Sequence, residues 1–332
     1  MLLLTASDVA DLIDMEGAIA ASTKAFVLTA TGEATTPVRH AIELGCGGAF
    51  TLFMPGFLPT EHILGVKVGS LIQSNSEHGL PATLCTILLL DPATGAAKAL
   101  MEATWLTALR TGAGIGAATR TLARTNVTTA TMVGAGGMAF HAIEAMLTAR
   151  PTLSRVNIWN RTIERGRSLQ QLLSTSFKER CEFAVADNLQ QAIEAADIVT
   201  ACTSSADPLI RGDWVGPGTH VNLAGAHSGT MREGDDALMR RAAIVTVDKL
   251  DAASASGEIA IPLASGILSP AKLNEIGRVI TGESRGRGTS SDITVFKSVG
   301  IAAQDLATAA LVLERALQHK KGTLFDLRPH DQ

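Results

Sequence analysis

A glycine-rich segment at residues 134–139 constrains the fold more than any other feature of the sequence. It reads Gly-Ala-Gly-Gly-Met-Ala, fits the pattern G-x-G-x-x-A, and directly follows residues 127–133, which we expect to form a strand. In this pattern the first glycine forms a tight turn, the second lets a pyrophosphate approach the backbone, and the small last residue lets a helix pack on a strand. The N–H groups at the start of that helix attract phosphate. We therefore expect a strand, a turn and a helix that bind a dinucleotide, and the alternative is a tight turn without a ligand.

Apolar runs and helical patterns alternate from this segment onward. The sequence predicts a helix over 138–149, a strand over 156–159 and a helix over 163–174. Further short apolar strands are expected at 183–186, 198–202, 221–224 and 244–247. Strands that alternate with helices form a parallel sheet covered on both faces. We therefore predict an α/β fold, with a Rossmann-type doubly wound parallel sheet in a domain of residues 119–302.

The flanking regions predict a second, smaller domain of α+β structure. Apolar residues recur at helical spacing from Asp8 to Thr31, with Ser7 and Asp8 as candidate caps, so two helices are expected there. Turn residues separate three runs that we expect to be strands, at 50–54, 63–71 and 82–90. A long helix is expected over 298–319. We assign residues 1–118 to this domain and expect the C-terminal helical segment, residues 303–332, to complete it.

Composition and charge exclude several classes of function. A chain of 332 residues is long enough for two domains, and its 46% hydrophobic and 18% charged residues are typical of a globular protein. The net charge of −4 is spread along the chain, so we expect no nucleic-acid or membrane partner. No signal peptide or membrane helix is recognisable, so a soluble cytoplasmic protein is expected. The 4 cysteines and 8 histidines lack the spacing of metal ligands, so we expect reduced thiols and no metal.

Basic residues after the second expected Rossmann strand bear on the choice of cofactor. NAD enzymes usually carry an acidic residue about 20 residues beyond the glycines, where it binds the ribose 2′-hydroxyl. This chain instead has Asn160, Arg161 and Thr162, with Arg165 and Arg167 close behind. Arginine can bind a 2′-phosphate with two hydrogen bonds, whereas a carboxylate would repel it. We therefore expect NADPH, with NADH possible, and the alternative is that these arginines form a solvated helix start.

Ordered motifs along the chain resemble the ornithine cyclodeaminase and mu-crystallin family. The matching segments are Pro37–Arg39, Leu64–Lys67, Leu106–Thr111, Val133–Gly136, Ile158–Thr162, Gly218–Gly225 and Thr294–Ser298. The family includes ornithine and lysine cyclodeaminases, an alanine dehydrogenase and reductases of cyclic ketimines. The resemblance implies that the smaller domain binds substrate and forms a homodimer, with the cofactor domain inserted into it.

The resemblance also places the substrate carboxylate among the cations Arg39, Lys67 and Arg110. Strand alternation supports Lys67 independently, because its side chain shares a face with Gly65 and Gly69 and should lie over a shallow, accessible floor. The alternative is a surface lysine on an edge strand. Arg110 lies in a glycine-rich helical segment that favours close packing, so a structural salt bridge is its alternative.

One position departs from the cyclodeaminase pattern. The resemblance implies that cyclodeaminases carry an aspartate at the position of His227, where it handles protons. Histidine can exchange a proton near neutral pH, but it offers no permanent negative charge to a substrate ammonium. We therefore expect an imine reductase in which Lys67 and His227 are catalytic. The alternatives are a cyclodeaminase with bound NAD, a non-catalytic NADPH-dependent binder, and a His227 that only caps a loop.

The sequence thus predicts NAD(P)H-dependent reduction of a cyclic 2-imino acid, Δ1-pyrroline-2-carboxylate or Δ1-piperideine-2-carboxylate, to L-proline or L-pipecolate. The cofactor-binding residues that we expect are Thr83, Arg110, Thr111, Gly134, Ala135, Gly136, Gly137, Met138, Asn160, Arg161, Thr162, Arg165, Thr203 and Ser204.

Overall fold

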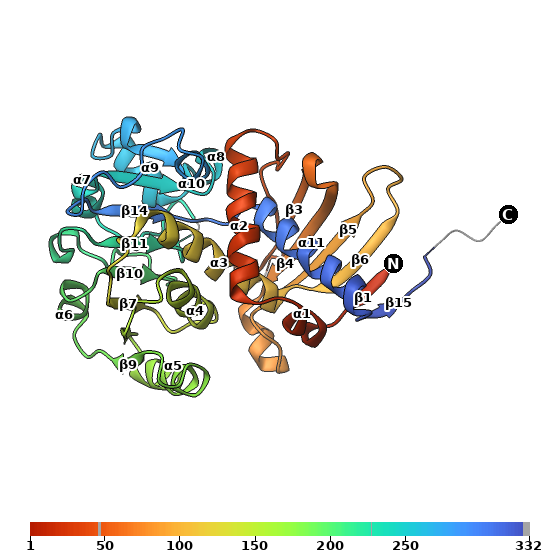
Figure 1. Cartoon of the computed structure of the whole chain (residues 1–332), viewed down its shortest axis with the longest axis horizontal. Coiled ribbons are helices and arrows are strands. Elements are labelled where there is room, and N and C mark those ends of the chain that lie inside the picture. The colour runs from red at the N-terminus through yellow and green to blue at the C-terminus, as the bar shows by residue number, and fades with distance from the viewer. Residues whose placement is uncertain (46–47, 227, 328–332) are drawn as a thin grey trace. The chain divides into compact units, whose positions relative to one another are not determined.

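The computed structural model describes residues 1–45, 48–226 and 228–327 and divides into two compact units (Figure 1). The first unit consists of Met1–Arg110 and Ile301–Gln332, and the second of Thr111–Gly300. The boundaries expected from the sequence, after residues 118 and 302, lie slightly further along the chain. Both units are built around their own sheet, and each is described by itself below.

The second unit contains an eight-stranded sheet in the order β13-β12-β14-β11-β10-β7-β8-β9, in which every pair is parallel. Its strands are β7 (Thr129–Val133), β8 (Arg155–Trp159), β9 (Glu182–Val185), β10 (Ile198–Ala201), β11 (His220–Leu223), β12 (Ile244–Val247), β13 (Leu273–Glu275) and β14 (Thr294–Lys297). The chain runs from β7 outward to β9, then returns to β10 on the other side of β7. The topological switch point therefore lies between β7 and β10, which is where such sheets bind ligands.

Every residue of β10, β11, β12 and β14 is buried, which indicates that helices cover both faces of this sheet. They are α4 (Ala139–Ala149), α5 (Ile163–Ser176), α6 (Leu189–Glu194), α7 (Asp236–Arg241), α8 (Leu250–Ala253), α9 (Gly257–Ala264) and α10 (Ile276–Ile280), together with most of α3 (Thr104–Leu122). The 3-10 turns η3 (Gly212–Trp214) and η4 (Pro270–Lys272) complete the unit. The predicted α/β fold with a Rossmann-type doubly wound sheet is confirmed.

The first unit contains a seven-stranded sheet in the order β15-β1-β6-β5-β4-β3-β2, in which only the β1–β6 pair is parallel. Its strands are β1 (Leu2–Leu4), β2 (His40–Glu43), β3 (Phe50–Leu58), β4 (Ile63–Leu71), β5 (Thr83–Leu90), β6 (Ala97–Glu102) and β15 (Thr323–Leu324). The 3-10 turns η1 (Pro59–Glu61) and η2 (Gln73–His78) follow β3 and β4. This sheet and its helices form the predicted α+β structure.

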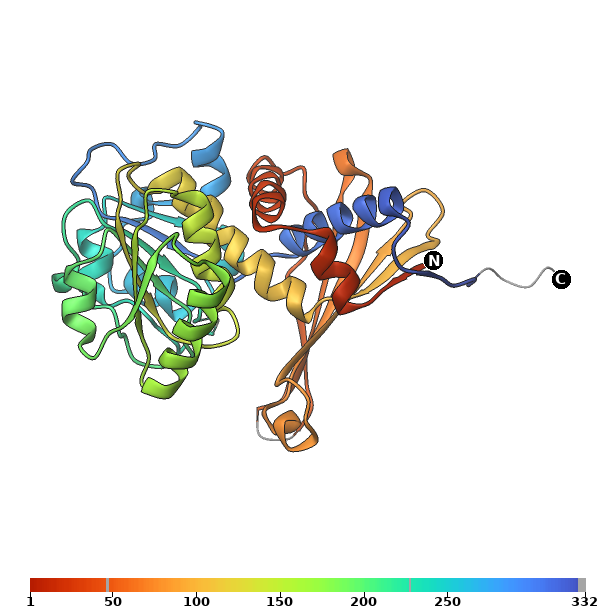
Figure 2. The same ribbon diagram turned by 60° about the horizontal axis from the view of Figure 1, so that its bottom comes forward.

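Helices α1 (Ala6–Leu12), α2 (Met15–Ala30) and α11 (Ala302–His319) belong to the first unit, and Figure 2 shows α2 and α11 on one side of its sheet. Helix α1 is capped by Thr5, whose side chain accepts from the Asp8 N–H while the Asp8 carboxylate accepts from Thr5. The prediction of Ser7 as a cap is therefore wrong, whereas Asp8 does take part.

Helix α11 lies directly on the face of the sheet that carries Gly65 of β4 and its paired residue Gly56 of β3. A Cβ at Gly65 would lie 2.9 Å from Leu306 Cδ2, and a Cβ at Gly56 would lie 2.9 Å from Leu306 Cδ1. The glycines therefore let a helix approach the sheet closely. The prediction that Lys67 lies over an accessible floor is wrong, because α11 covers this face and leaves Lys67 3% exposed.

Within the described residues, no helix combines the length and the apolar character that crossing a membrane requires.

Candidate functional site

A buried cluster of three charged side chains lies in the first unit. Lys67 on β4 and Arg110 on α3 both donate to Oδ1 of Asp305 on α11, with N–O distances of 2.9 Å and 2.8 Å. The side chains of Lys67, Arg110 and Asp305 are 4%, 7% and 0% exposed. We call these residues the cation cluster. The sequence predicted its two cations as substrate ligands but missed Asp305.

The cation cluster contains two positive side chains and one negative side chain, so it carries a formal net charge of +1. Burial and the neighbouring Arg110 guanidinium lower the pKa of Lys67, while Asp305 opposes that shift. An uncompensated buried charge is unfavourable, so this arrangement favours binding of an anion.

Arg110 has the hydrogen-bonding groups to bind that anion. Only its Nε donates to Asp305, and within the described part of the chain the two terminal amino groups have no partner. A guanidinium with two parallel N–H groups available can bind a carboxylate through two hydrogen bonds. The salt bridge considered as an alternative role for Arg110 is present, and it leaves this edge of the guanidinium available.

Arg39 precedes β2 and is half-buried. The strand register places its neighbour His40 opposite Phe53, and Met54 opposite Lys67. Arg39 therefore lies beside the strand pair that carries Lys67, and its part in substrate binding stays a prediction.

The predicted dinucleotide turn lies at the switch point of the second unit's sheet. Gly134 follows β7 with φ at 104°, and a Cβ there would lie 2.8 Å from the Cys202 carbonyl oxygen. Its N–H donates to the Trp159 carbonyl at 2.8 Å, and the Cys202 N–H donates to the Val133 carbonyl at 3.0 Å. Both the left-handed conformation and the close approach of β10 require glycine at this position.

The rest of the turn forms an open cradle at the start of α4. A Cβ at Gly136 or Gly137 would meet no atom within 4 Å, and Met138 caps the helix without a side-chain hydrogen bond. Among the residues that the structure describes, the N–H groups of these three residues have no partner. Free N–H groups at a helix N-terminus bind phosphate, so this turn fits a pyrophosphate.

The neighbouring loop holds the turn in place. The Asn160 side chain accepts from the Ala135 N–H at 3.0 Å and donates to the Thr162 carbonyl at 2.8 Å. Arg161 and Arg165 are exposed, as is Arg167, and none of them forms an ion pair with another described residue. Their guanidinium groups therefore remain available to a phosphate.

A buried glutamate that the sequence analysis missed links two loops at the same edge of the sheet. Glu233 Oε1 accepts from the N–H and hydroxyl of Thr203 at 2.7 Å and 3.0 Å, and its Oε2 accepts from the Gly225 N–H at 2.7 Å and the Ala226 N–H at 3.3 Å. The hydroxyl of Thr203, which was predicted to bind the cofactor, thus already has a partner. Ser204 beside it is exposed.

Two further buried charges support this linked pair of loops. Lys297 donates to the Ala226 carbonyl and lies 3.8 Å from Glu258, which in turn accepts from the N–H groups of Glu233 and Gly234. Burial raises the pKa of Glu258. The predicted catalytic residue His227 follows Ala226 directly and lies outside the described residues.

Two other predicted cofactor contacts lie on different units. Thr83 begins β5 in the first unit and is exposed, whereas Thr111 lies in α3 in the second unit and is buried. Their roles in cofactor binding stay predictions.

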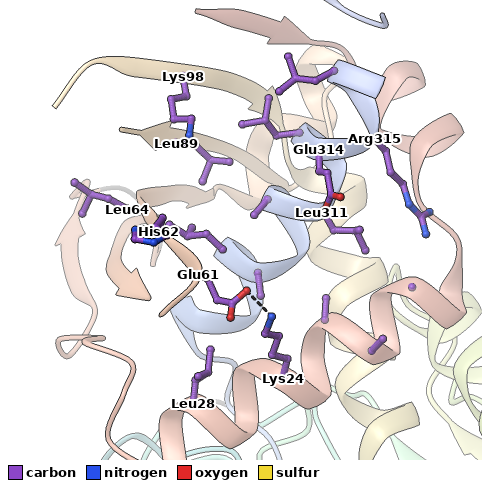
Figure 3. Close-up of a pocket in the computed structure, with 18 of the residues that line it drawn as sticks. Lys24, Leu28, Glu61, His62, Leu64, Leu89, Lys98, Leu311, Glu314 and Arg315 are labelled. Atoms are coloured by element: carbon purple, nitrogen blue, oxygen red, sulfur yellow. Dashed lines mark hydrogen bonds and ion pairs between the residues drawn. The ribbon is translucent and has the colours of Figure 1, made fainter. Parts of the chain in front are cut away.

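A cavity of about 620 Å³ opens in the first unit between α2, α11 and the β3–β4 connection (Figure 3). An ion pair between Lys24 and Glu61 spans it, and Leu89 and Leu311 form part of its apolar wall. None of the residues predicted to bind substrate or cofactor lines this cavity.

Comparison with known proteins gives consistent matches over nearly the whole chain. Residues 1–320 match the model of the ornithine cyclodeaminase/mu-crystallin family. The structure of Thermococcus litoralis Δ1-pyrroline-2-carboxylate reductase in complex with NADH and L-proline is 35% identical, with a TM-score of 0.92 over 98% of this chain and 100% of that chain. An archaeal alanine dehydrogenase dimer with bound NAD is 30% identical, with a TM-score of 0.91 over 99% of each chain.

A plant relative extends these matches to eukaryotes. The protein SAR DEFICIENT 4 of Arabidopsis thaliana is 36% identical over 287 residues, which cover 85% of this chain and 88% of that protein. The two solved structures agree with the fold of this chain over nearly its whole length. The chain therefore belongs to the ornithine cyclodeaminase/mu-crystallin family.

Proposed function

We propose that this protein is an NAD(P)H-dependent oxidoreductase that reduces a cyclic 2-imino acid, Δ1-pyrroline-2-carboxylate or Δ1-piperideine-2-carboxylate, to L-proline or L-pipecolate. The observation that carries the proposal is the cation cluster, which has a net positive charge and an available guanidinium edge within a chain that also has a dinucleotide turn. The similar reductase of T. litoralis is described with NADH and L-proline.

In this proposal Arg110 binds the substrate carboxylate, and Lys67 adds a second positive charge beside it. The lowered pKa of Lys67 makes its ammonium a stronger acid than an ordinary lysine, which suits a proton donor. A nicotinamide cofactor held by the dinucleotide turn would supply hydride for the imine carbon. Either Lys67 or His227 supplies the proton that the imine nitrogen gains, and both are retained as catalytic candidates.

The second unit supplies the groups that hold the cofactor. The N–H groups of Gly136, Gly137 and Met138 would bind the pyrophosphate, and Arg161 with Arg165 would bind a ribose 2′-phosphate. We therefore propose a preference for NADPH over NADH, supported by exposed arginines that have no partner among the described residues.

We also propose a homodimer formed through the first unit. Exposed apolar side chains gather along the two edge strands of its sheet, and an exposed apolar edge is an aggregation hazard unless another chain covers it. These side chains, 43% to 81% exposed, are Val38, Ile42 and Leu44 near β2, and Leu324, Phe325 and Leu327 near β15. Light scattering after size exclusion should give twice the chain mass. Ile42→Lys should lower that mass, whereas Leu172→Lys on α5 should not.

One assay tests the reaction. Purified protein is mixed with Δ1-pyrroline-2-carboxylate and either NADPH or NADH, and cofactor oxidation is followed by absorbance. We expect oxidation that depends on the imine and yields L-proline. Ammonia release from ornithine without added cofactor would instead indicate a cyclodeaminase. Cofactor binding without turnover on any imine would indicate a binding protein.

A further inference from the structure

We propose that Asp305 is a positioning residue, which keeps the Lys67 ammonium charged as a proton donor and aims the Arg110 guanidinium at the substrate carboxylate. This inference rests on the proposed function. In this role Asp305 acts through Lys67 and Arg110 and need not touch the substrate.

The hydrogen bonds of Asp305 point to this role. One oxygen, Oδ1, accepts from both Lys67 and Arg110, and therefore fixes Nζ of one and Nε of the other around a single point. The other oxygen, Oδ2, is buried and has no partner among the described residues. A structural aspartate in an interior normally has both oxygens satisfied, so an unpaired one calls for another explanation. The explanation that we propose is that Asp305 serves the two cations, because both hydrogen bonds of its carboxylate among the described residues go to them through Oδ1.

The surroundings of Lys67 make Asp305 its main stabilising charge. The groups that affect it are Arg110 on α3, Asp305 on α11 and Cys85 on β5. Its directly paired neighbours in the sheet, Met54 on β3 and Ile87 on β5, are apolar. Burial and Arg110 both lower the pKa of Lys67, and the Asp305 carboxylate is the main group that raises it.

Removal of the Asp305 charge should therefore act on Lys67 in a defined direction. Burial and Arg110 lower the pKa of Lys67, and in Asp305→Asn the carboxylate that opposes them is lost. The pKa of Lys67 therefore falls, and its ammonium loses the proton at lower pH. The pKa shift from one close charge is about one to three units. Arg110 remains charged and keeps its two terminal amino groups, so carboxylate binding should suffer less than proton donation.

The activity test compares three variants with the wild type over a range of pH. For Asp305→Asn we expect the basic limb of the pH profile of kcat to move at least about one pH unit toward acid. At pH values above the shifted limb, kcat should be about tenfold lower than in the wild type, and KM should change less. Asp305→Glu should restore most of the limb. Thr308→Val is the matched control, because Thr308 is also buried on α11 and its hydroxyl donates to the Gln304 carbonyl within the same helix. Equal loss of kcat at every pH would overturn the inference.

A second measurement does not depend on the reaction. Competitive acetylation followed by mass spectrometry of the Lys67 peptide gives the titration of this amine in each variant. Lys67 should become reactive at lower pH in Asp305→Asn and at higher pH in Arg110→Gln, because Arg110 lowers the pKa that Asp305 raises. The second variant keeps the test decisive if Asp305→Asn does not fold. An unchanged titration in both variants would overturn the inference.

The two measurements separate the inference from the proposed function. A wild type that reduces no imine, with the expected Lys67 titrations, would refute the function and support the role of Asp305 in setting the charge of Lys67. An active wild type with unchanged titrations would refute the role of Asp305 alone.

Discussion

Removing the Lys67 ammonium changes the charge of the cation cluster without altering any residue of the dinucleotide turn. In Lys67→Met, Asp305 keeps only Arg110 as a partner, and the formal charge of the cluster falls from +1 to zero. A hydrogen bond to a charged group contributes about 1.5–3 kcal/mol. KM for the imine should therefore rise roughly 10- to 150-fold, since about 1.4 kcal/mol corresponds to a factor of ten.

The assay measures KM for Δ1-pyrroline-2-carboxylate by cofactor oxidation, and the dissociation constant of NADPH by fluorescence titration. Lys67→Met retains a side chain of similar length between Met54 and Ile87, whereas Lys67→Ala also leaves a cavity and should lose about 2–5 kcal/mol of stability. NADPH affinity should stay within about twofold in the methionine variant, because independent sites contribute additively. An unchanged KM, or an equal loss of imine and NADPH binding, would refute the proposed role of Lys67.

Three other predictions concern the cofactor and the proton. Arg161→Asp should shift the ratio of kcat/KM values from NADPH toward NADH, because it replaces a cation with a repelling charge; an unchanged ratio would place the 2′-phosphate elsewhere. His227→Ala should lower turnover at least about a hundredfold and remove a pH dependence near the ordinary histidine pKa of about 6.5, with partial recovery at low pH where solvent protonates the imine. Normal turnover and an unchanged profile would leave His227 a loop residue. Gly134→Ala should cost about 1–3 kcal/mol because its Cβ would meet the Cys202 carbonyl, whereas Gly136→Ala should keep the Tm and weaken cofactor binding; equal Tm values would contradict this difference.

The sequence predicted those strands and turns whose pattern lies within one continuous segment of the chain. The strand β4 begins and ends at the residues expected, because turn residues flank a run whose centre, residues 64–69, alternates between two kinds of side chain. The turn at Gly134 was also predicted, since each of its small residues has a specific steric role. By contrast β14 was missed as a strand, because only four residues, two of them polar, occupy a position in the middle of the sheet. Burial between other strands, rather than its own pattern, makes this segment a strand.

The cation cluster was predicted only in part for a similar reason. Asp305 lies 195 residues from Arg110 and 238 residues from Lys67 in the sequence, so no local spacing connects them. One signal was present: Asp305 occupies the apolar stripe of α11 together with Ala302 and Leu306, all of which are buried. A charged residue on the buried face of an amphipathic helix needs a charged partner, and lysine or arginine elsewhere in the same unit could have been sought for it.

The Glu233 carboxylate, which accepts from Thr203, Gly225 and Ala226, also has a consequence for motion. These N–H groups belong to two loops, yet their protection from solvent depends on one buried side chain. Native-state exchange reports regions that open together as cooperative units. The amide hydrogens of the two loops should therefore exchange through one shared opening, with a common free energy, even though about twenty residues of intervening chain separate them. Either loop can then become mobile only when the other does.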